Sequence, residues 1–567
     1  MQRIKLPYGI SNFKSLREQN YIYIDKTSYI AILESLGGKY LFYTRPRRFG
    51  KSLFLSVLEH YYGLEHENKF TALFAGLHIG QHPTVIRNSY FVLKLNFSGL
   101  NTEDQWALES SFRLAFKDAL ITFFNKYSDF FAEAAMYKET IHHKEDFRSL
   151  WSLLFEAVRD SGYKIYLIID EYDHFANDII AMGDGAFYKQ IVRAAGFVRD
   201  FYEAIKIGTE TVIDRIFMTG VSPIMLDDLT SGFNISTNLT MSVTLNEMLG
   251  FTEKEVKTLM DQIGMDSAEE TTIQDLRKNY NGYLFNKDGQ AKVYNPDMIL
   301  YFLTQWQMSG HYPEQLMDEN VKTDYGRLQR LIANDHNRQM LNEIIQNEEV
   351  AADIINKFSF DQMYDDHNFV SLLFYMGLLT IDRQEKMRLV LKIPNYVIKT
   401  VFWEYIEKRL RSEYEIRLNT EELRLTIEQM AFEGTIKPYI KYIAENVLKS
   451  LSNRDLAQFN EKYIKVILFT YLIGSKAYRP YSEREIENGY IDIYLEKDLR
   501  IQGIQYEWIL ELKYVKKSDS ALLAKVTEDG LMQLANYAAS RELAGKPGVK
   551  QALIIFIGKD EHVVIES

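Results

Sequence analysis

A short stretch near the start of the sequence has residues suited to binding phosphate. YTRPRRFGKSLFL (43–55) contains Gly50-Lys51-Ser52, the end of the phosphate-loop pattern G-x-x-x-x-G-K-[ST]. In that pattern the lysine reaches the β- and γ-phosphates, and the serine hydroxyl binds Mg²⁺. The first glycine would stand at position 45, which is Arg45 here. The spacing therefore predicts a nucleotide-binding loop with a basic entrance.

Two carboxylates end the apolar stretch YKIYLIIDEYD (163–173). Such a run is typical of a buried parallel strand, and ligands bind at the carboxyl edge of open α/β sheets. We therefore predict that Asp170 holds Mg²⁺ and that Glu171 positions the attacking water, with Asp173 as the nearest alternative for the catalytic role. Taken alone, an Asp-Glu pair after a strand is a solvated turn, but the upstream loop favours a nucleotide site.

A threonine ends a further strand-like run, RIFMTGVSP (215–223). Thr219 is a candidate sensor of the γ-phosphate, because it would stand at the same sheet edge as Asp170. A threonine at the end of a strand is as often structural, so both interpretations stay open.

Three charged residues lie on strand-like runs near the end of the chain. Asp492 interrupts YIDIYL (490–495), and Glu511 and Lys513 stand two apart in YEWILELKYVKK (506–517). Residues two apart on a strand share a face. Buried strands seldom carry such charges unless they are paired or functional. The three charges therefore indicate a functional site, and the alternative is a structural Asp492–Lys513 salt bridge.

The elements around the first site alternate between strands and helices. KYLFYT (39–44) is predicted to be a buried strand, and SLFLSVLEHYYG (52–63) a helix that stops at its glycine. The loop thus lies between strand and helix, where helix N–H groups face phosphate. YFVLKLNFSGL (90–100) supplies another strand. The fold class predicted for this region is α/β, a parallel sheet with a phosphate loop.

The middle of the chain is predicted to be mainly helical. FTEKEVKTLM (251–260) has a threonine cap with Glu255 at the third helical position, a capping box. The segments 368–381 and 388–406 indicate a helix, a strand pair and a helix, as in a winged-helix fold. Such folds bind DNA or serve as packing modules, and the composition favours the packing role because the segments are not strongly basic.

Composition limits the setting. A chain of 567 residues predicts several domains, because single cores rarely exceed about 250–300 residues. The absence of cysteine excludes disulfides and thiolate zinc sites, and the net charge of −12 argues against indiscriminate nucleic-acid coating. Apolar runs are too short to span a membrane, so we expect a cytoplasmic protein with no membrane partner. The succession of strand-like and helical segments along the chain predicts domains at 1–240, 241–450 and 451–567.

The first region resembles the AAA-ATPase-like family of bacterial P-loop ATPases. The matching text is LPYGISNFKSLREQNYIYIDKTSYI (6–30), RPRRFGKSLFLS, LIIDEYD, FMTGVSP, YNGYLF (280–285) and VYNPDMI (293–299). In this family the loop reads R-P-R-R-F-G-K-S, so Pro46 fixes the bend and the arginines add bonds to phosphate; one arginine is a candidate finger in cis. The resemblance implies ATP and Mg²⁺, and a middle region that closes over the nucleotide. Its predicted nucleotide ligands are Arg45, Arg48, Phe49, Gly50, Lys51, Ser52, Asp170 and Thr219, with Ser52 and Asp170 on Mg²⁺.

The same resemblance includes a D-K-T element at Asp25, Lys26 and Thr27. Its role is open, and one interpretation is that Thr27 caps the next helix.

The last region resembles the PD-(D/E)XK nuclease superfamily, a restriction-endonuclease-like α/β fold. Asp492 and the E-L-K triplet match its core motif, and Gln533 with Tyr537 match its Q-x-x-x-Y helix. The resemblance implies that Asp492, Glu511 and Glu485 hold Mg²⁺ or Mn²⁺, with Glu483 as the rival of Glu485. It also implies that metal-bound water is the nucleophile and that Lys513 steadies the charge on the scissile phosphate. One departure is Tyr490, which stands where the family has arginine, and it weakens the case for cleavage.

Together these features predict an ATP-binding ATPase whose metal-dependent nuclease-like domain acts on DNA or RNA. The alternative is a switch or scaffold, driven by nucleotide, whose nuclease fold binds without cleaving. A transcription regulator that uses the middle region is a third, weaker reading. A homo-oligomer is left open.

Overall fold

The computed structural model describes residues 4–567 except 183–184, 194–195, 226–232, 267–269, 327–334, 358–364, 452–459, 488 and 544. Two compact units can be distinguished in it. The N-terminal unit comprises Met1–Met308, Leu316–Asn342 and Glu349–Tyr396, and the C-terminal unit comprises Ser309–Gln315, Glu343–Glu348 and Val397–Ser567. This is a coarser division than the predicted one at 240 and 450, which stays a prediction.

A parallel sheet forms the centre of the N-terminal unit. Its strand order is β2-β3-β4-β1-β5, and every pairing is parallel. The strands are β1 (Tyr40–Thr44), β2 (Phe91–Asn96), β3 (Ile165–Asp170), β4 (Ile213–Gly220) and β5 (Thr237–Asn238). All six residues of β3 are buried, which explains its continuous apolar sequence. The strands predicted at 39–44, 90–100, 163–173 and 215–223 are therefore confirmed.

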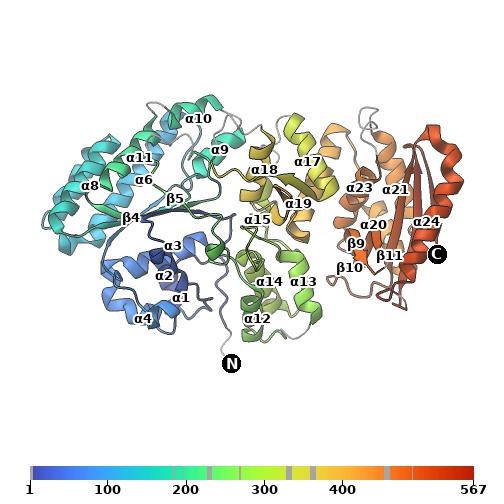
Figure 1. Ribbon diagram of the computed structural model, residues 1–567, viewed down its shortest axis with the longest axis horizontal. Helices are drawn as coiled ribbons and strands as arrows, with labels where there is room; N and C mark the ends of the chain where they lie inside the picture. The colour runs from blue at the N-terminus through green and yellow to red at the C-terminus, as the bar shows by residue number, and fades with distance from the viewer. Residues whose placement is uncertain are drawn as a thin grey trace. The chain divides into compact units, whose positions relative to one another are not determined.

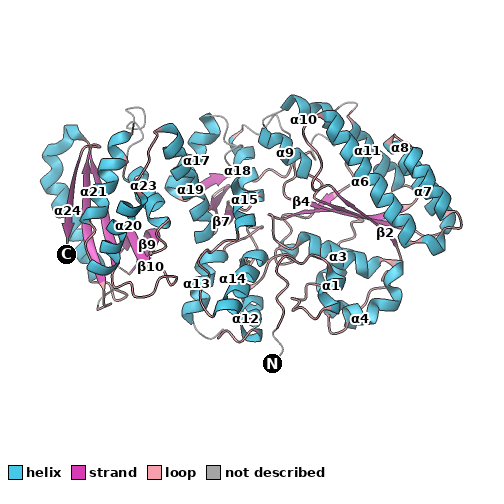
Figure 2. Cartoon of the chain, turned by 180° about the vertical axis from the view of Figure 1, so that it is seen from behind, coloured by secondary structure: helices cyan, strands magenta, loops and turns pink. Residues whose placement is uncertain are grey.

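Helices cover both faces of this sheet. Helix α3 (Lys51–Tyr62) lies on one face with α1 and α2, and α6, α8 and α11 lie on the other (Figure 1). The same two layers are visible from behind (Figure 2). The bounds of the other helices here are α1 (Phe13–Glu18), α2 (Ser28–Ser35), α4 (Phe70–Phe74), α5 (His78–Gln81), α6 (Gln105–Lys126), α7 (Ala134–His143), α8 (Phe147–Ser161), α9 (His174–Met182), α10 (Gly185–Val192) and α11 (Phe197–Gly208).

The middle of the chain is mainly helical, as predicted. The capping box forms at the start of α12 (Glu253–Gln262), where Thr252 and Glu255 bond to each other's main chain. The other helices are α13 (Glu270–Tyr280), α14 (Pro296–Ser309), α15 (Glu319–Gly326), α17 (Asp335–Asn347), α18 (Asp366–Tyr375), α19 (Tyr396–Glu413), α20 (Thr420–Glu428) and α21 (Lys437–Asn446).

A small antiparallel sheet accompanies these helices. Its order is β6-β8-β7, formed by β6 (Glu349–Ala352), β7 (Thr380–Glu385) and β8 (Arg388–Lys392). The predicted succession of helix, strand pair and helix is confirmed as α18, β7, β8 and α19, while β6 was not predicted. All but the first residue of α19 belong to the C-terminal unit, and the winged-helix arrangement of the four elements stays a prediction.

A mixed sheet forms the core of the C-terminal unit. Its order is β13-β12-β11-β10-β9, antiparallel except for the parallel pair β11–β12. The strands are β9 (Tyr478–Ile486), β10 (Gly489–Lys497), β11 (Glu507–Val515), β12 (Val549–Ile557) and β13 (Glu561–Glu566). Helix α23 (Glu461–Ile473) precedes them, and α24 (Leu523–Ala538) packs on β11 and β12. The predicted restriction-endonuclease-like order is present, with β13 added.

Candidate functional site

The phosphate loop joins β1 to α3, as its sequence predicts. Gly50 caps α3 with a left-handed backbone at φ 88°, and Arg48 is also left-handed at φ 67°. A left-handed residue is easy for glycine and costly for a side chain, so Gly50 fits the cap and Arg48 holds strain. This geometry aims the N–H groups of the first α3 turn at the cavity described below.

Lys51 is held inside the loop that precedes it. Its ammonium donates to the main-chain oxygens of Arg45 at 3.0 Å and Pro46 at 3.1 Å. The residue is only 5% exposed, yet it lines the cavity. A compact cation bound by neutral carbonyls keeps its charge available to an anion, which suits a phosphate-binding lysine.

Arg45 differs from its predicted role as a phosphate ligand. Its guanidinium donates to the main-chain oxygens of Thr44, Thr240 and Leu245, at 2.9–3.1 Å. It also lies 3.9 Å from the ring centroid of Phe285, and burial lowers its pKa to about 10. Arg45 is 1% exposed and is not among the cavity-lining residues. The side chain therefore braces the loop from behind, in place of contacting phosphate.

Phe49 explains why the YNGYLF stretch accompanies the loop. Its ring packs edge-on against Tyr283 at 5.0 Å and Phe285 at 5.5 Å, between ring centroids. Phe49 is buried but still contributes to the cavity wall. The two rings from residues 280–285 thus fix the loop from the side, through Phe49 and through Arg45.

Thr219 is already engaged with the sheet. Its hydroxyl donates to the main-chain oxygen of Tyr43 at 2.6 Å, and the residue is buried and does not line the cavity. Of the two interpretations left open, this geometry favours the structural one.

Asp170 and Asp173 are both buried but have opposite surroundings. Asp170 is 1% exposed, and among the described residues neither of its carboxylate oxygens has a hydrogen-bond partner. Asp173 accepts from the main-chain N–H of Val221 and Ser222 and from the Asn177 amide. Burial and the charge of Glu171 raise the pKa of Asp173. Asp170 does not line the cavity, but a buried carboxylate without partners is costly and suits a bound cation, whereas Asp173 is a structural anchor.

Glu171 stands between them in a strained conformation. Its backbone is left-handed at φ 53°, and its side chain lines the cavity. Non-glycine residues held this way cluster at functional sites. The turn after β3 therefore directs Glu171 into the cavity, whereas Asp170 and Asp173 are buried.

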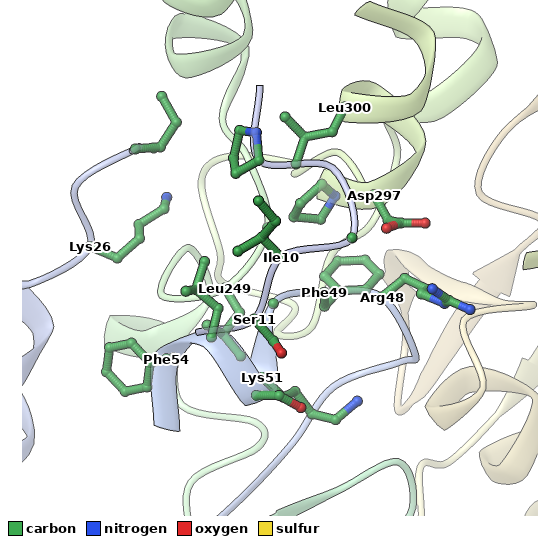
Figure 3. Close-up of a pocket in the computed structure, with 18 of the residues that line it drawn as sticks. Ile10, Ser11, Lys26, Arg48, Phe49, Lys51, Phe54, Leu249, Asp297 and Leu300 are labelled. Atoms are coloured by element: carbon green, nitrogen blue, oxygen red, sulfur yellow. The ribbon is translucent and has the colours of Figure 1, made fainter. Parts of the chain in front are cut away.

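The cavity beside the loop has a volume of about 470 Å³, within the range of ligand pockets. Lys51 and Ser52 lie at its phosphate-loop end, and Ile10, Leu249 and Leu300 supply apolar wall, with Lys51 drawn near the lower end and Leu300 near the upper end of Figure 3. The wall also carries the charged residues Lys26, Arg48 and Asp297, so the cavity offers both cationic groups for a phosphate tail and apolar surface for a flat ring.

The D-K-T element connects this cavity to helix α12. The Lys26 ammonium lines the cavity, pairs with Glu255 at 2.7 Å and donates to the main-chain oxygen of Glu247 at 3.1 Å. Thr27 precedes α2 but makes no side-chain cap: its hydroxyl donates to Asp25 and accepts from the main-chain N–H of Ile79. The capping role considered for Thr27 is therefore wrong.

The C-terminal unit brings Asp492, Glu511 and Lys513 together. The Lys513 ammonium lies 2.6 Å from one Glu511 oxygen, and the Tyr537 hydroxyl donates to the other at 3.0 Å. The main-chain N–H of Leu512 donates to Asp492 at 3.0 Å. Burial and the charge of Asp492 raise the pKa of Glu511, against the opposing effect of Lys513. Lys513 thus pairs with Glu511, not with Asp492 as the salt-bridge alternative had it.

A second lysine, Lys465, was missed by sequence reasoning. From helix α23 its ammonium contacts Asp492 at 3.2 Å and Glu483 at 2.9 Å. Glu483, the rival, therefore shares a partner with Asp492, while the exposed Glu485 pairs in the strand register with Tyr490. The signal that could have found Lys465 is its place in the apolar run YIKVILF (463–469).

Two observations argue against an open metal site in this arrangement. All four carboxylate oxygens of Asp492 and Glu511 have protein donors. Within the described part of the chain, no three His, Asp or Glu side chains converge in a way that could hold a metal ion. A divalent ion therefore does not fit here unless a lysine moves.

Gln533, of the predicted Q-x-x-x-Y helix, carries a buried side-chain oxygen without a partner among the described residues.

Both ends of the chain match known protein families. Residues 7–230 match the family model described as predicted AAA-ATPase, and residues 459–566 match that of the PD-(D/E)XK nuclease superfamily. An uncharacterized protein in the vnfD 5′ region of Azotobacter chroococcum mcd 1 is 31% identical over 307 residues, or 53% of this chain and 52% of that protein. The chain thus spans about half the length of this curated relative.

Two solved structures are more distant. A Walker-type ATPase of Pyrococcus abyssi has a TM-score of 0.41 at 12% identity, covering 71% of this chain and 99% of its own. A STAND protein with a tetratricopeptide repeat sensor from Pyrococcus horikoshii has a TM-score of 0.24 at 11% identity, covering 80% and 58%. Neither likeness is close enough to support an argument. Among the described residues, no helix has both the length and the apolarity to cross a membrane.

Proposed function

We propose, from the AAA-ATPase-like domain at residues 7–230 and the PD-(D/E)XK nuclease superfamily domain at residues 459–566, that the protein binds and hydrolyses ATP and acts on nucleic acid through its C-terminal unit. The observation that carries the first half is Asp170, a buried carboxylate without a partner among the described residues, at the same sheet edge as the phosphate loop. A cytoplasmic location and self-association are further, weaker parts of the proposal.

The residues of the nucleotide site fit ATP with Mg²⁺. Asp170 and Ser52 would hold the ion, which when bound supplies charge neutralisation to the phosphates. Lys51 and the N–H groups at the start of α3 bind the phosphates, since both present positive charge to the cavity. Glu171 orients the attacking water. Arg48 lines the cavity and remains the candidate for extra phosphate charge, whereas Arg45 does not.

Calorimetry of ATP binding tests this site. Lys51→Ala is expected to weaken Mg-ATP binding at least about 100-fold, because a charge-assisted bond to phosphate is lost. Lys39→Ala is the matched control: Lys39 lies just before β1 but pairs with Asp214 at 2.6 Å, outside the cavity. Equal affinities of wild type and Lys51→Ala would rule out the assignment.

The nuclease fold of the C-terminal unit supports action on nucleic acid, but two functions compete. Metal-dependent cleavage needs open carboxylate oxygens. The paired oxygens of Asp492 and Glu511, and the exposed Tyr490 in place of arginine, favour a module that binds without cleaving. Incubation of DNA and RNA with wild type and Asp492→Ala, in Mg²⁺ or Mn²⁺, separates the two. Cleavage that Asp492→Ala abolishes would establish the nuclease; binding alone would establish the module.

A further inference from the structure

The C-terminal unit contains a buried lysine ammonium, that of Lys465. Helix α23 of the C-terminal unit is labelled in Figure 1. Lys465 lies on this helix, and its side chain is 6% exposed. Its neighbours on this helix, from Tyr463 to Leu472, are all buried. A buried ammonium is stable only where it is paired, and Lys465 is paired twice, with Asp492 at 3.2 Å and Glu483 at 2.9 Å.

The remaining donors complete the arrangement. Lys513 and Tyr537 occupy the two oxygens of Glu511, and the Leu512 N–H occupies the second oxygen of Asp492. Three carboxylates therefore face two ammonium groups.

We propose that the Lys465 ammonium occupies the cation position of the C-terminal site and keeps divalent metal away from Asp492. An ammonium and a divalent ion compete for the same carboxylate oxygen, and their like charges repel at this range. Carboxylates that share a site repel unless a cation or a proton lies between them, and for Asp492 and Glu483 the chain supplies the cation. The inference rests on the proposed nuclease-like function of this unit, and it makes Lys465 the residue that decides whether metal enters.

Direct Mn²⁺ binding to the full chain, without nucleotide, tests the inference. Electron paramagnetic resonance counts unbound Mn²⁺, and an Asp492→Asn variant identifies the part of the binding that belongs to this site. Wild type and Asp492→Asn are expected to bind Mn²⁺ alike. Lys465→Met keeps the length of the side chain and removes its charge. This variant is expected to bind Mn²⁺ at the Asp492 site at least tenfold more tightly than wild type does. Lys465→Met/Asp492→Asn should lose it.

Charge, not shape, should control this gain. Lys465→Arg keeps the charge and is expected to bind Mn²⁺ as wild type does. Lys465→Met leaves Asp492 and Glu483 without their cation, so its thermal midpoint should fall, and Mn²⁺ should raise it again by several degrees without raising that of wild type. If Lys465→Met does not fold, Lys465→Gln takes its place in both measurements.

Two results would overturn the inference. One is an Mn²⁺ site in wild type at submillimolar concentration that the folded Asp492→Asn variant lacks. The other is the absence of any gain in the folded uncharged variant. Failure of the nuclease proposal is distinguishable: no cleavage in any variant, together with the gain of Mn²⁺ in Lys465→Met, would leave Lys465 in its role and remove the nuclease.

Discussion

At the scale of residues, the nucleotide site is defined by a contrast among the three acidic residues of the segment 170–173. Asp170 lacks hydrogen-bond partners within the described residues, Glu171 is strained and faces the cavity, and Asp173 holds the turn to β4. Chemistry and stability are therefore divided between neighbours that look alike in sequence, and substitution should separate them.

The first pair of variants tests this division. Glu171→Gln is expected to keep ATP binding and to slow hydrolysis at least about 100-fold, because the water loses its base while the charge on phosphate is untouched. Its thermal midpoint should stay at the wild-type value. Steady-state hydrolysis with calorimetric binding measures both effects. A wild-type hydrolysis rate in Glu171→Gln would move the role elsewhere.

Asp173→Asn is the matched variant two residues away. It should destabilise the N-terminal unit by about 2 kcal/mol, because the carboxylate accepts main-chain bonds from Val221 and Ser222 that an amide cannot all accept. Chemical denaturation measures the loss. If Asp173→Asn is as stable as wild type yet inactive, then Asp173 is catalytic and not an anchor.

A buried histidine makes the N-terminal unit sensitive to acid. His66 stacks on His60 with ring centroids 4.2 Å apart, and its side chain is 14% exposed. Burial, then the nearby His60 and Lys126, lower the pKa of His66 from 6.5 to about 3. Between these two pKa values His66 is protonated in the unfolded chain and neutral in the folded chain. The contribution of His66 to the free energy of unfolding is therefore complete above pH 6.5 and is lost as the pH falls toward 3.

His66→Phe should remove this part of the acid sensitivity while it keeps an aromatic ring against His60. Lowering the pH from 7 to 5 is expected to destabilise wild type by about 1–2 kcal/mol more than the variant, since each pH unit in this window contributes about 1.4 kcal/mol at most. Parallel denaturation curves at the two pH values measure the difference. Identical pH dependence in both proteins would contradict the assignment.

At the scale of elements, one ion pair joins the N-terminal segment to the helical middle. Lys26 bonds to Glu255 of α12, and Glu255 also closes the capping box of that helix. Helix α12 is in turn joined to α13 through the two-bond pair of Arg277 with Glu253. Because Lys26 lines the cavity, a ligand there and the start of α12 share one charged contact.

Lys26→Met should therefore loosen α12. We expect amide hydrogen exchange in the first turns of the helix to become about tenfold faster, because a partly buried pair worth about 1–2 kcal/mol is lost. Lys257→Met is the control on the same helix, since Lys257 is exposed and lies 3.8 Å from Glu253. Equal acceleration by both variants would mean that general charge loss, not the Lys26 contact, governs the helix.

At the scale of the whole molecule, the two compact units should unfold separately, and ATP should act on one of them. Mg-ATP at 100 times its dissociation constant adds about 2.7 kcal/mol to the free energy of unfolding of the unit that binds it. Scanning calorimetry is expected to resolve two transitions, of which ATP raises one by a few degrees. Lys51→Ala should abolish that shift, whereas Asp492→Ala should keep it. A single transition that ATP raises as a whole would show that the units unfold as one.

Much of this architecture could be predicted from the sequence because it depends on local patterns. The strand, loop and helix around Gly50-Lys51-Ser52 follow from an apolar run, a left-handed glycine and a helical periodicity that lie within a few residues of one another. The acidic ending of β3 and the E-x-K spacing on β11 are local in the same sense. The capping box at Thr252 needed only its own helix.

What each charged side chain does was decided by tertiary structure. Arg45 looks like its neighbour Arg48 in sequence, but Thr240 and Leu245, far along the chain, supply the carbonyls that bury its guanidinium. Lys465 is an ordinary helical lysine until β9 and β10 bring Glu483 and Asp492 to it. The sequence by itself determined which residues are able to bind phosphate or metal. Folding determined which of them are already bound, because a charge removed from water must find its partner among residues that only the fold brings near.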